Sequence, residues 1–339
     1  MTMIEEHKLG EMLANEAFIR RASEIDMPFM LKGSYVTRQY FENPNDRLPA
    51  DLDWVYVNNI ADVAIAGDIF NEWATAVTEY PMHDGVVFTS FKKNAFWRMI
   101  DYAMADDFPT VNTDLSCTVD GKEFGPLRLD ISFNLPIDKE PAAELLYKPL
   151  RGKPFTVPCS VALYLQVSWK LHQTLVRPRF KDMFDLIRLV QHPAFDNYTL
   201  QETMQALADE CAVDNVDMSR MVFLLSGDAE KLFKQDGIHA TWDYWRNGHR
   251  KNPSHNNLLI EKAESITNTD LLPVSLNVFL QQFTDALKKS GFTQELIRNY
   301  LPLQAIRPPV TKELIQERKT RTPAKTVHFL YLISKLFKR

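Results

Sequence analysis

Cysteine is scarce in this chain of 339 residues, and so are long apolar segments. The three cysteines, Cys117, Cys159 and Cys211, are scattered and odd in number, so they provide neither a disulfide framework nor the spacing of a zinc site. No apolar run approaches the roughly 20 residues that a membrane-spanning helix needs. The polar, acidic N-terminus, MTMIEEHKLGEM, lacks the pattern of a signal peptide. These absences predict a cytoplasmic protein without a membrane span.

An excess of positive charge is also lacking, because the net charge is −5. The chain as a whole is therefore not a basic nucleic-acid binder, and any contact with a polyanion must come from local patches. Residues 241–257, TWDYWRNGHRKNPSHNN, predict a loop whose rings stack on bases and whose cations pair with phosphates. The ordinary alternative places these rings in the core and the cations in solvent.

A second basic stretch lies at the end of the chain. Residues 311–339 contain eight Lys or Arg and two Glu, which gives a net charge of +6. Residues 324–338 have the pattern of a basic amphipathic helix. This pattern favours docking on the protein body or on RNA phosphates over contact with a membrane surface.

Length and composition predict an ordinary globular protein of about two domains. Proline and glycine cluster between Pro136 and Pro158, so we place a boundary there, with domains at 1–155 and 156–339. The first domain mixes patterns of helix and strand, and the second is helical, which predicts an α+β protein. We expect helices over 3–26, 60–80, 96–105, 161–175, 180–191, 199–236 (two helices), 257–265, 274–290 and 293–301, and strands over 51–57, 85–90, 110–119 and 127–135.

The stretch from Phe29 to Val57 carries the strongest chemical pattern. Gly33 and Ser34 end an apolar run, and after sixteen intervening residues (35–50) Asp51-Leu52-Asp53 lead into a predicted strand. A strand places both carboxylates on one face with Cα atoms about 6.6 Å apart. At that distance two carboxylates can converge on a pair of divalent ions, while the glycine lets the backbone approach a phosphate and the serine hydroxyl bonds it. The alternative is a solvated pair of loop aspartates.

Three further positions complete the candidate set. The alternation of LRLDISFNL, residues 127–135, places Asp130 mid-strand on the polar face, where it is either a surface carboxylate or a third metal ligand or general base beside the first two. Asp182 and Asp185 share one face of a predicted helix. Alternatively, Asp182 complements the helix dipole and Asp185 is solvated.

These residues match a known signature. Gly33-Ser34, Arg47 and Asp51-Leu52-Asp53-Trp54 resemble the Gly-Gly/Ser…Asp-x-Asp signature of the DNA polymerase β-like nucleotidyltransferases. LKGSYVTRQYF…RLPADLDWVYV is similar in particular to the LKGGTAL…RxSxDLDF of the AbiEii/AbiGii toxin family. A second match, to that family's KLxAxxxR…RDxxDL, runs through Lys170, Arg177, Lys181-Asp182 and Asp185-Leu186.

The match has limits. It covers roughly residues 25–190. Ser34 replaces the second glycine, and Lys181 stands where the family usually has arginine. The gap from Ser34 to Asp51 is longer than is typical of the superfamily, though close to this family. None of these departures removes a carboxylate.

The resemblance implies a polymerase β-like nucleotidyltransferase domain, a mixed sheet flanked by helices, followed by an α-helical domain with a basic tail. It implies metal-dependent transfer of a nucleotide from an NTP to an acceptor, with tRNA or another RNA as our expectation. It also implies the toxin of a bacterial toxin–antitoxin or phage-defence system, with a cognate antitoxin as partner. The alternatives are a protein hydroxyl or a small molecule as acceptor, or a non-catalytic nucleotide-binding module, which the intact acidic trio disfavours.

Each candidate residue receives a role from this interpretation. The carboxylates Asp51, Asp53 and Asp130 would hold Mg²⁺ or Mn²⁺, and Asp130 would help to deprotonate the attacking hydroxyl. Lys170 would place a point charge on the triphosphate. Asp182 and Asp185 would orient either Lys170 or the acceptor. The predicted nucleotide-binding residues are Gly33, Ser34, Arg38, Arg47, Lys170 and Arg177.

Overall fold

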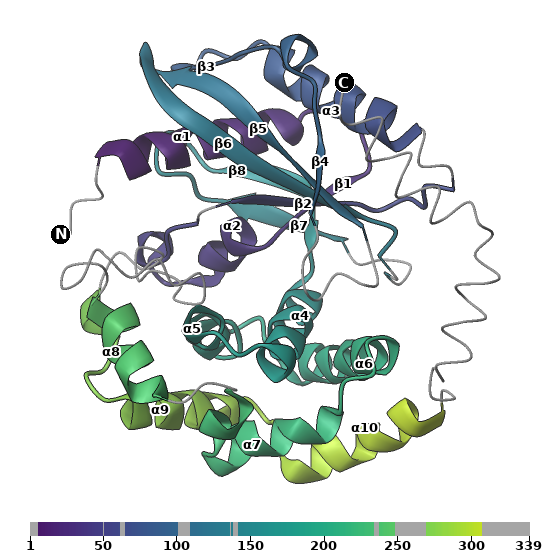
Figure 1. Cartoon of the computed structure of the whole chain (residues 1–339), viewed down its shortest axis with the longest axis vertical. Coiled ribbons are helices and arrows are strands. Elements are labelled where there is room, and N and C mark those ends of the chain that lie inside the picture. The colour runs from purple at the N-terminus through teal and green to yellow at the C-terminus, as the bar shows by residue number, and fades with distance from the viewer. Residues whose placement is uncertain are drawn as a thin grey trace.

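The computed structural model describes residues 6–49, 51–61, 65–100, 109–135, 137, 142–233, 237–247 and 269–306. Figure 1 shows two halves: a curled sheet with helices packed on it, and below it an assembly of helices. The predicted α+β class is therefore confirmed. Within the described residues, no helix is both long and apolar enough to cross a membrane.

A mixed sheet forms the first half. Its strands run in the order β3-β5-β6-β2-β1-β8-β7, and β4 pairs with β5. The central strand β2 is antiparallel to β1 and parallel to β6, while β1 is parallel to β8. The strands are β1 (Phe29–Lys32), β2 (Leu52–Tyr56), β3 (Val86–Phe88), β4 (Arg98–Ile100), β5 (Thr110–Val119), β6 (Lys122–Phe133), β7 (Ala142–Tyr147) and β8 (Phe155–Val161).

Aromatic packing fixes which face of β2 is buried. Trp54 is 2% exposed and lies in edge contact with Phe18 of α1 (Glu6–Ala22) and Trp73 of α3 (Ala66–Glu79). Because side chains alternate along a strand, Asp53 must point to the opposite face. The aromatic cluster thus holds the acidic face of β2 away from these two helices.

The second half is built from helices around its own apolar core. Pro178 stands between α4 and α5, where a proline cannot continue a helix. Phe41, from the first half, packs into this second core and contacts Phe184 of α5. The helices are α4 (Leu163–Val176), α5 (Phe180–Leu189), α6 (Asn197–Val213), α7 (Met221–Ser226), α8 (Ile238–Asn247), α9 (Leu276–Lys289) and α10 (Gln294–Ile306); the short α2 (Ser34–Thr37) belongs to the first half.

Two local predictions were wrong. The helix expected over 96–105 is replaced at Arg98–Ile100 by β4, because pairing with residues 110–112 of β5 overrides the local helical pattern. The loop expected from residue 241 is helical to Asn247, and Trp242 and Trp245 are 1% and 2% exposed within the second core. Residues 248–257 and the basic tail, 311–339, lie outside the described residues. The expected boundary at 155/156 stays a prediction; β8 belongs to the sheet, and α4 begins at Leu163.

Candidate functional site

The three predicted carboxylates lie on neighbouring strands. Asp51 immediately precedes β2, Asp53 lies within it, and Asp130 lies on β6. The parallel register pairs Asp53 with Asp130, so strand pairing brings Asp130 beside the Asp-x-Asp segment as expected. The side chain of Asp53 is 28% exposed and that of Asp130 is 6% exposed. Asp53 therefore remains accessible to a ligand from the open face of the sheet.

Gly33 lies directly against the Asp53 carboxylate. Its φ of 75° and ψ of −148° are disfavoured for residues with a Cβ. A Cβ at this position would lie 2.2 Å from Asp53 Oδ2. The glycine thus gives both the backbone conformation and the space that the carboxylate needs, and Ser34 follows it as the first residue of α2.

Cations surround the carboxylates. Lys32 Nζ lies 3.9 Å from Asp53 Oδ1, and Arg128 Nε donates to Asp130 Oδ1 at 3.2 Å. Burial and the neighbouring charge of Asp53 raise the pKa of Asp51, although the cations Arg128, Lys181 and Lys8 counteract this. On balance the ionised form of Asp51 is disfavoured relative to a free aspartate, and any further cation close to it would favour that form.

The carboxylates fit a divalent ion in kind, and two of them lie on paired positions of neighbouring strands. They are ionisable oxygen donors, and Gly33 leaves room beside Asp53. As they stand, however, the described residues contain no group of three or more His, Cys, Asp or Glu side chains that could hold a metal ion. The hydrogen bond from Arg128 also occupies a carboxylate oxygen of Asp130 that a metal ion would use.

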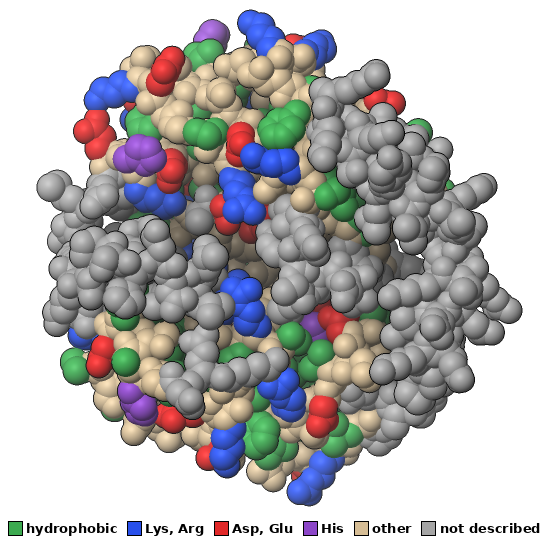
Figure 2. Space-filling model, viewed as in Figure 1, with side chains coloured by type: hydrophobic (Ala, Val, Ile, Leu, Met, Phe, Trp, Pro, Cys, Tyr) green, Lys and Arg blue, Asp and Glu red, His purple; other side chains and the backbone are tan. Residues whose placement is uncertain are grey.

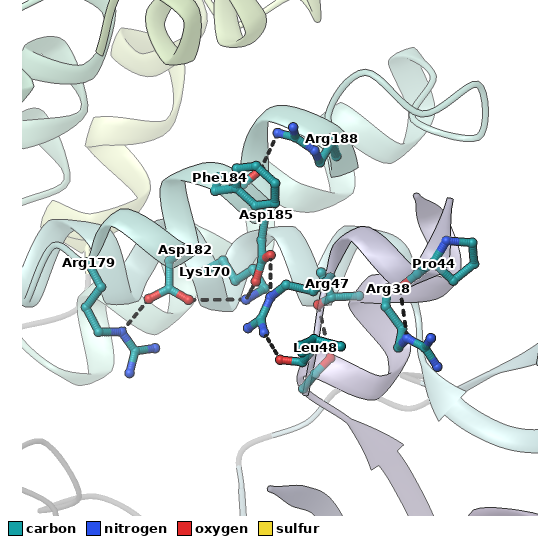
Figure 3. A network of polar contacts seen from close by, with 12 residues as sticks. Arg38, Pro44, Arg47, Leu48, Lys170, Arg179, Asp182, Phe184, Asp185 and Arg188 are labelled. Atoms are coloured by element: carbon teal, nitrogen blue, oxygen red, sulfur yellow. Dashed lines mark hydrogen bonds and ion pairs between the residues drawn. The ribbon is translucent and has the colours of Figure 1, made fainter. Parts of the chain in front are cut away.

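The helical half contributes a buried network of charges, drawn in Figure 3. Lys170 Nζ on α4 donates to Asp185 Oδ2 at 2.8 Å and to Asp182 Oδ1 at 3.2 Å, both on α5. Arg179 Nε also donates to Asp182. The side chains of Asp182 and Asp185 are 2% and 0% exposed. Both predicted aspartates thus contact Lys170 directly.

The charges in this network stabilise one another. Burial acts to raise the pKa of Asp182 and Asp185, but the cations around them outweigh it and both pKa values are lowered. Burial acts to lower the pKa of Lys170, and the two aspartates outweigh it, so that pKa is raised. Lys170 therefore carries its positive charge at neutral pH. Two of its three N–H donors are directed to the aspartates.

Gln166 is a residue of the site that sequence reasoning missed. Its Nε2 donates to Thr37 Oγ1 at 2.9 Å and to the Gly33 carbonyl at 3.4 Å, and the residue is 3% exposed. Gln166 and Lys170 are four residues apart and hence on one face of α4. That spacing was the available signal. Through Gln166, the helix that carries Lys170 is joined to the Gly33 turn.

The predicted cationic residues lie in different surroundings. Arg47 is 3% exposed, with Nε donating to Asp185 Oδ1 at 2.9 Å. Arg38 is fully buried, where it bonds Glu16 and the carbonyl of Pro44. Arg177 is exposed at the C-terminal end of α4. Their nucleotide-binding roles stay predictions. Because Arg38 is buried, it could affect a bound nucleotide only through the 43–47 loop, whose Pro44 carbonyl it bonds.

The space between the halves has charged walls. Figure 2 shows a hollow there, with Lys and Arg side chains on both sides of it and acidic side chains on the sheet side. The carboxylates of β2 and β6 and the Lys170 network come from opposite halves.

Similarity to known proteins covers most of the chain. Residues 18–290 match the profile of the family described as nucleotidyl transferase AbiEii toxin, type IV TA system. None of the curated proteins matches the chain. The structure of MenT4, a nucleotidyltransferase toxin from Mycobacterium tuberculosis H37Rv, is similar with a TM-score of 0.50 and 12% identity over 92% of this chain and 96% of that one. At this identity the likeness shows the fold alone.

A second solved structure, assigned as a nucleotidyltransferase from H. pylori, has a TM-score of 0.36 and 18% identity over 83% of this chain and 98% of that one. A TM-score this low carries no argument. The family profile, in contrast, spans most of the chain, from the end of α1 to the end of α9. This chain therefore belongs to the AbiEii family of nucleotidyltransferase toxins of type IV toxin–antitoxin systems.

Proposed function

We propose that this protein transfers a nucleotide from an NTP to an RNA acceptor, tRNA in particular, in a reaction that requires Mg²⁺ or Mn²⁺. In this proposal it acts as the toxin of a toxin–antitoxin or phage-defence system and is restrained by a cognate antitoxin. The observation that carries the proposal is the parallel register of β2 and β6, with Gly33 against the Asp53 carboxylate. This register brings Asp130 beside the Asp-x-Asp signature.

The acidic residues have two tasks. Asp51, Asp53 and Asp130 would hold the divalent ions, which neutralise phosphate charge when bound. For Asp130 to do so, Arg128 must release it. Asp130 also accepts the proton of the acceptor hydroxyl. The hydroxyl oxygen then forms a bond to the α-phosphorus, and the bond from that phosphorus to the β-phosphate oxygen breaks. Pyrophosphate leaves with the bonding electron pair.

The remaining residues bind the triphosphate. Lys170 directs two of its three N–H donors to aspartates, and the third is the donor that we assign to a phosphate oxygen. Asp182 and Asp185 keep the ammonium group charged and oriented. The Gly33 backbone and the Ser34 hydroxyl hold the outer phosphates, and Arg177 supplies a cation at the end of α4.

Labelled nucleotides test this function. The purified protein is incubated with each α-labelled NTP, with Mg²⁺ or Mn²⁺, and with either total RNA or an RNA-free lysate. We expect label in the tRNA fraction, and its loss with Asp53→Asn. Asp120→Asn is the matched control, because Asp120 lies in the turn between β5 and β6, at the far end of this hairpin from Asp130, in an exposed ion pair with Arg151. Label found only on protein or on small molecules would identify that class, instead of RNA, as the acceptor. Transfer that persists in Asp53→Asn would refute the assignment of the site.

A further inference from the structure

A closed circuit of contacts joins the two halves around the site. Starting at Asp53, it passes to Gly33, whose carbonyl accepts a hydrogen bond from Gln166. It follows α4 for one turn, about 6 Å, to Lys170. From Lys170 it crosses to Asp185 and then to Arg47 (Figure 3). From Arg47 it returns along the chain to Asp51.

Arg47 closes this circuit through a shared carboxylate. Asp185 accepts from Lys170 at Oδ2, 2.8 Å away, and from Arg47 at Oδ1, 2.9 Å away. The same arginine donates from Nη1 to its neighbour's carbonyl, Leu48 O, at 2.6 Å. Leu48 precedes Asp51 by three residues, a span of at most about 10 Å. One guanidinium therefore fixes both the partner of Lys170 and the segment that leads to Asp51.

The burial of these groups makes the circuit stiff. The side chains of Arg47 and Asp185 are 4% and 0% exposed, and Gln166 is 3% exposed. Buried charged hydrogen bonds are strong, and the loss of one partner leaves the other uncompensated. Without Arg47, the ammonium of Lys170 would be the one cation left in the described residues that hydrogen-bonds the carboxylate of Asp185. The lysine donor assigned to phosphate would then be pulled toward α5.

We propose that Arg47 and Gln166 are positioning residues, which fix Lys170 relative to the aspartates of β2 and do not themselves contact the nucleotide. This inference rests on the proposed function, because it assumes that Lys170 binds the triphosphate. It assigns Arg47 a role different from the nucleotide contact expected from sequence, and it adds Gln166, for which no role was expected.

A double-mutant cycle on nucleotide affinity separates positioning from contact. NTP affinity is measured by calorimetry in the presence of Mn²⁺, in the wild type and in a Lys170→Gln background. We expect Arg47→Ala and Gln166→Leu each to weaken binding about tenfold in the wild type, and by less than about twofold in Lys170→Gln. Residues that act through Lys170 have nothing left to position once it is replaced.

Phe41→Leu is the control for a general loosening of the interface. Phe41 is 5% exposed and contacts Phe184 between the same halves, but it carries no charge. This variant should lower Tm and leave NTP affinity unchanged. An Arg47→Ala effect that persists undiminished in Lys170→Gln would overturn the proposal in favour of direct contact. Unchanged affinity in both single variants would also overturn it.

Two further measurements keep the proposal testable if a variant misfolds or the wild type binds no NTP. Arg47→Lys keeps a charge without the planar guanidinium, so it should weaken NTP binding less than Arg47→Ala does. This smaller loss should likewise vanish in the Lys170→Gln background. If the wild type binds no NTP, the proposed function fails. The coupling between Arg47 and Lys170 is then measured through the Tm values of the variants in the absence of nucleotide. The Tm losses of Arg47→Ala and Lys170→Gln should then be clearly less than additive, because both act on Asp185. Additive losses would overturn the coupling.

Discussion

Gly33→Ala is the substitution for which the structure gives the most definite consequence. The new Cβ would lie 2.2 Å from Asp53 Oδ2, whereas an ordinary contact begins at 3.4 Å, so the oxygen must move by about 1.2 Å. Misplacement of a catalytic group by about 1 Å can cost about a hundredfold in rate. The φ of 75° adds backbone strain of about 1–3 kcal/mol. We therefore expect a folded protein with a Tm several degrees lower and nucleotide transfer reduced about a hundredfold or more.

Gly121→Ala separates the two effects. Gly121 has a similar φ of 79°, in the turn between β5 and β6, but a Cβ there would meet nothing within 4 Å. Both variants should lose stability through strain, and Gly33→Ala alone should lose transfer. The assays are thermal unfolding, incorporation of labelled nucleotide, and calorimetric titration with Mn²⁺. A folded Gly33→Ala protein with transfer within about threefold of wild type would refute the close packing of Gly33 on the carboxylate.

The other predictions concern three ionisable groups. Asp130→Asn should reduce labelled-nucleotide transfer about a hundredfold or more, while Asp120→Asn, in the turn at the far end of the hairpin, leaves it unchanged. Equal activity of the two variants would remove Asp130 from the site. Lys170→Ala leaves two buried aspartates short of a cation, so the free energy of unfolding should fall by about 3–5 kcal/mol in thermal unfolding. Calorimetry should show a weaker NTP affinity. Unaltered stability would contradict the buried network. Burial raises the pKa of Glu210 to about 7 from an ordinary value of 4.5. Because the folded state then binds the proton more tightly, stability should fall as pH rises from about 4.5 to about 7. Glu210→Gln should flatten this part of the Tm–pH curve, and an unchanged slope would count against the shift.

Much of the acidic site could be predicted because strands have a period of two residues. Asp51 and Asp53 share a face by spacing alone, and the alternation of β6 places Asp130 on its polar face. Sequence could not determine that β6 lies next to β2, in a register that pairs Asp130 with Asp53. That pairing joins residues far apart in the chain, and no local pattern specifies it.

The surroundings of the arginines were harder to predict, for the same reason. A cation beside a Gly-Ser and Asp-x-Asp pattern suggests phosphate binding, yet the partners observed are protein carboxylates. Asp185 lies 138 residues from Arg47, and Glu16 lies 22 residues before Arg38. In α8, the three-residue spacing of Trp242 and Trp245 was a helical signal, but the cations that follow it favoured a loop. In each case a distant partner or core decided the outcome.

The separate cores of the two halves explain why the junction between them matters. Each half has its own apolar cluster, so neither needs the other to bury most of its hydrophobic surface. The acidic face of β2 belongs to one half and Lys170 to the other. Where cores are separate, relative motion of two halves is the ordinary expectation. Buried polar contacts are directional and lose much when misaligned, so the Arg47–Asp185 pair and the Gln166 bond restrict that motion more sharply than apolar packing does. The circuit thus ties the position of Lys170 to that of the carboxylates it faces.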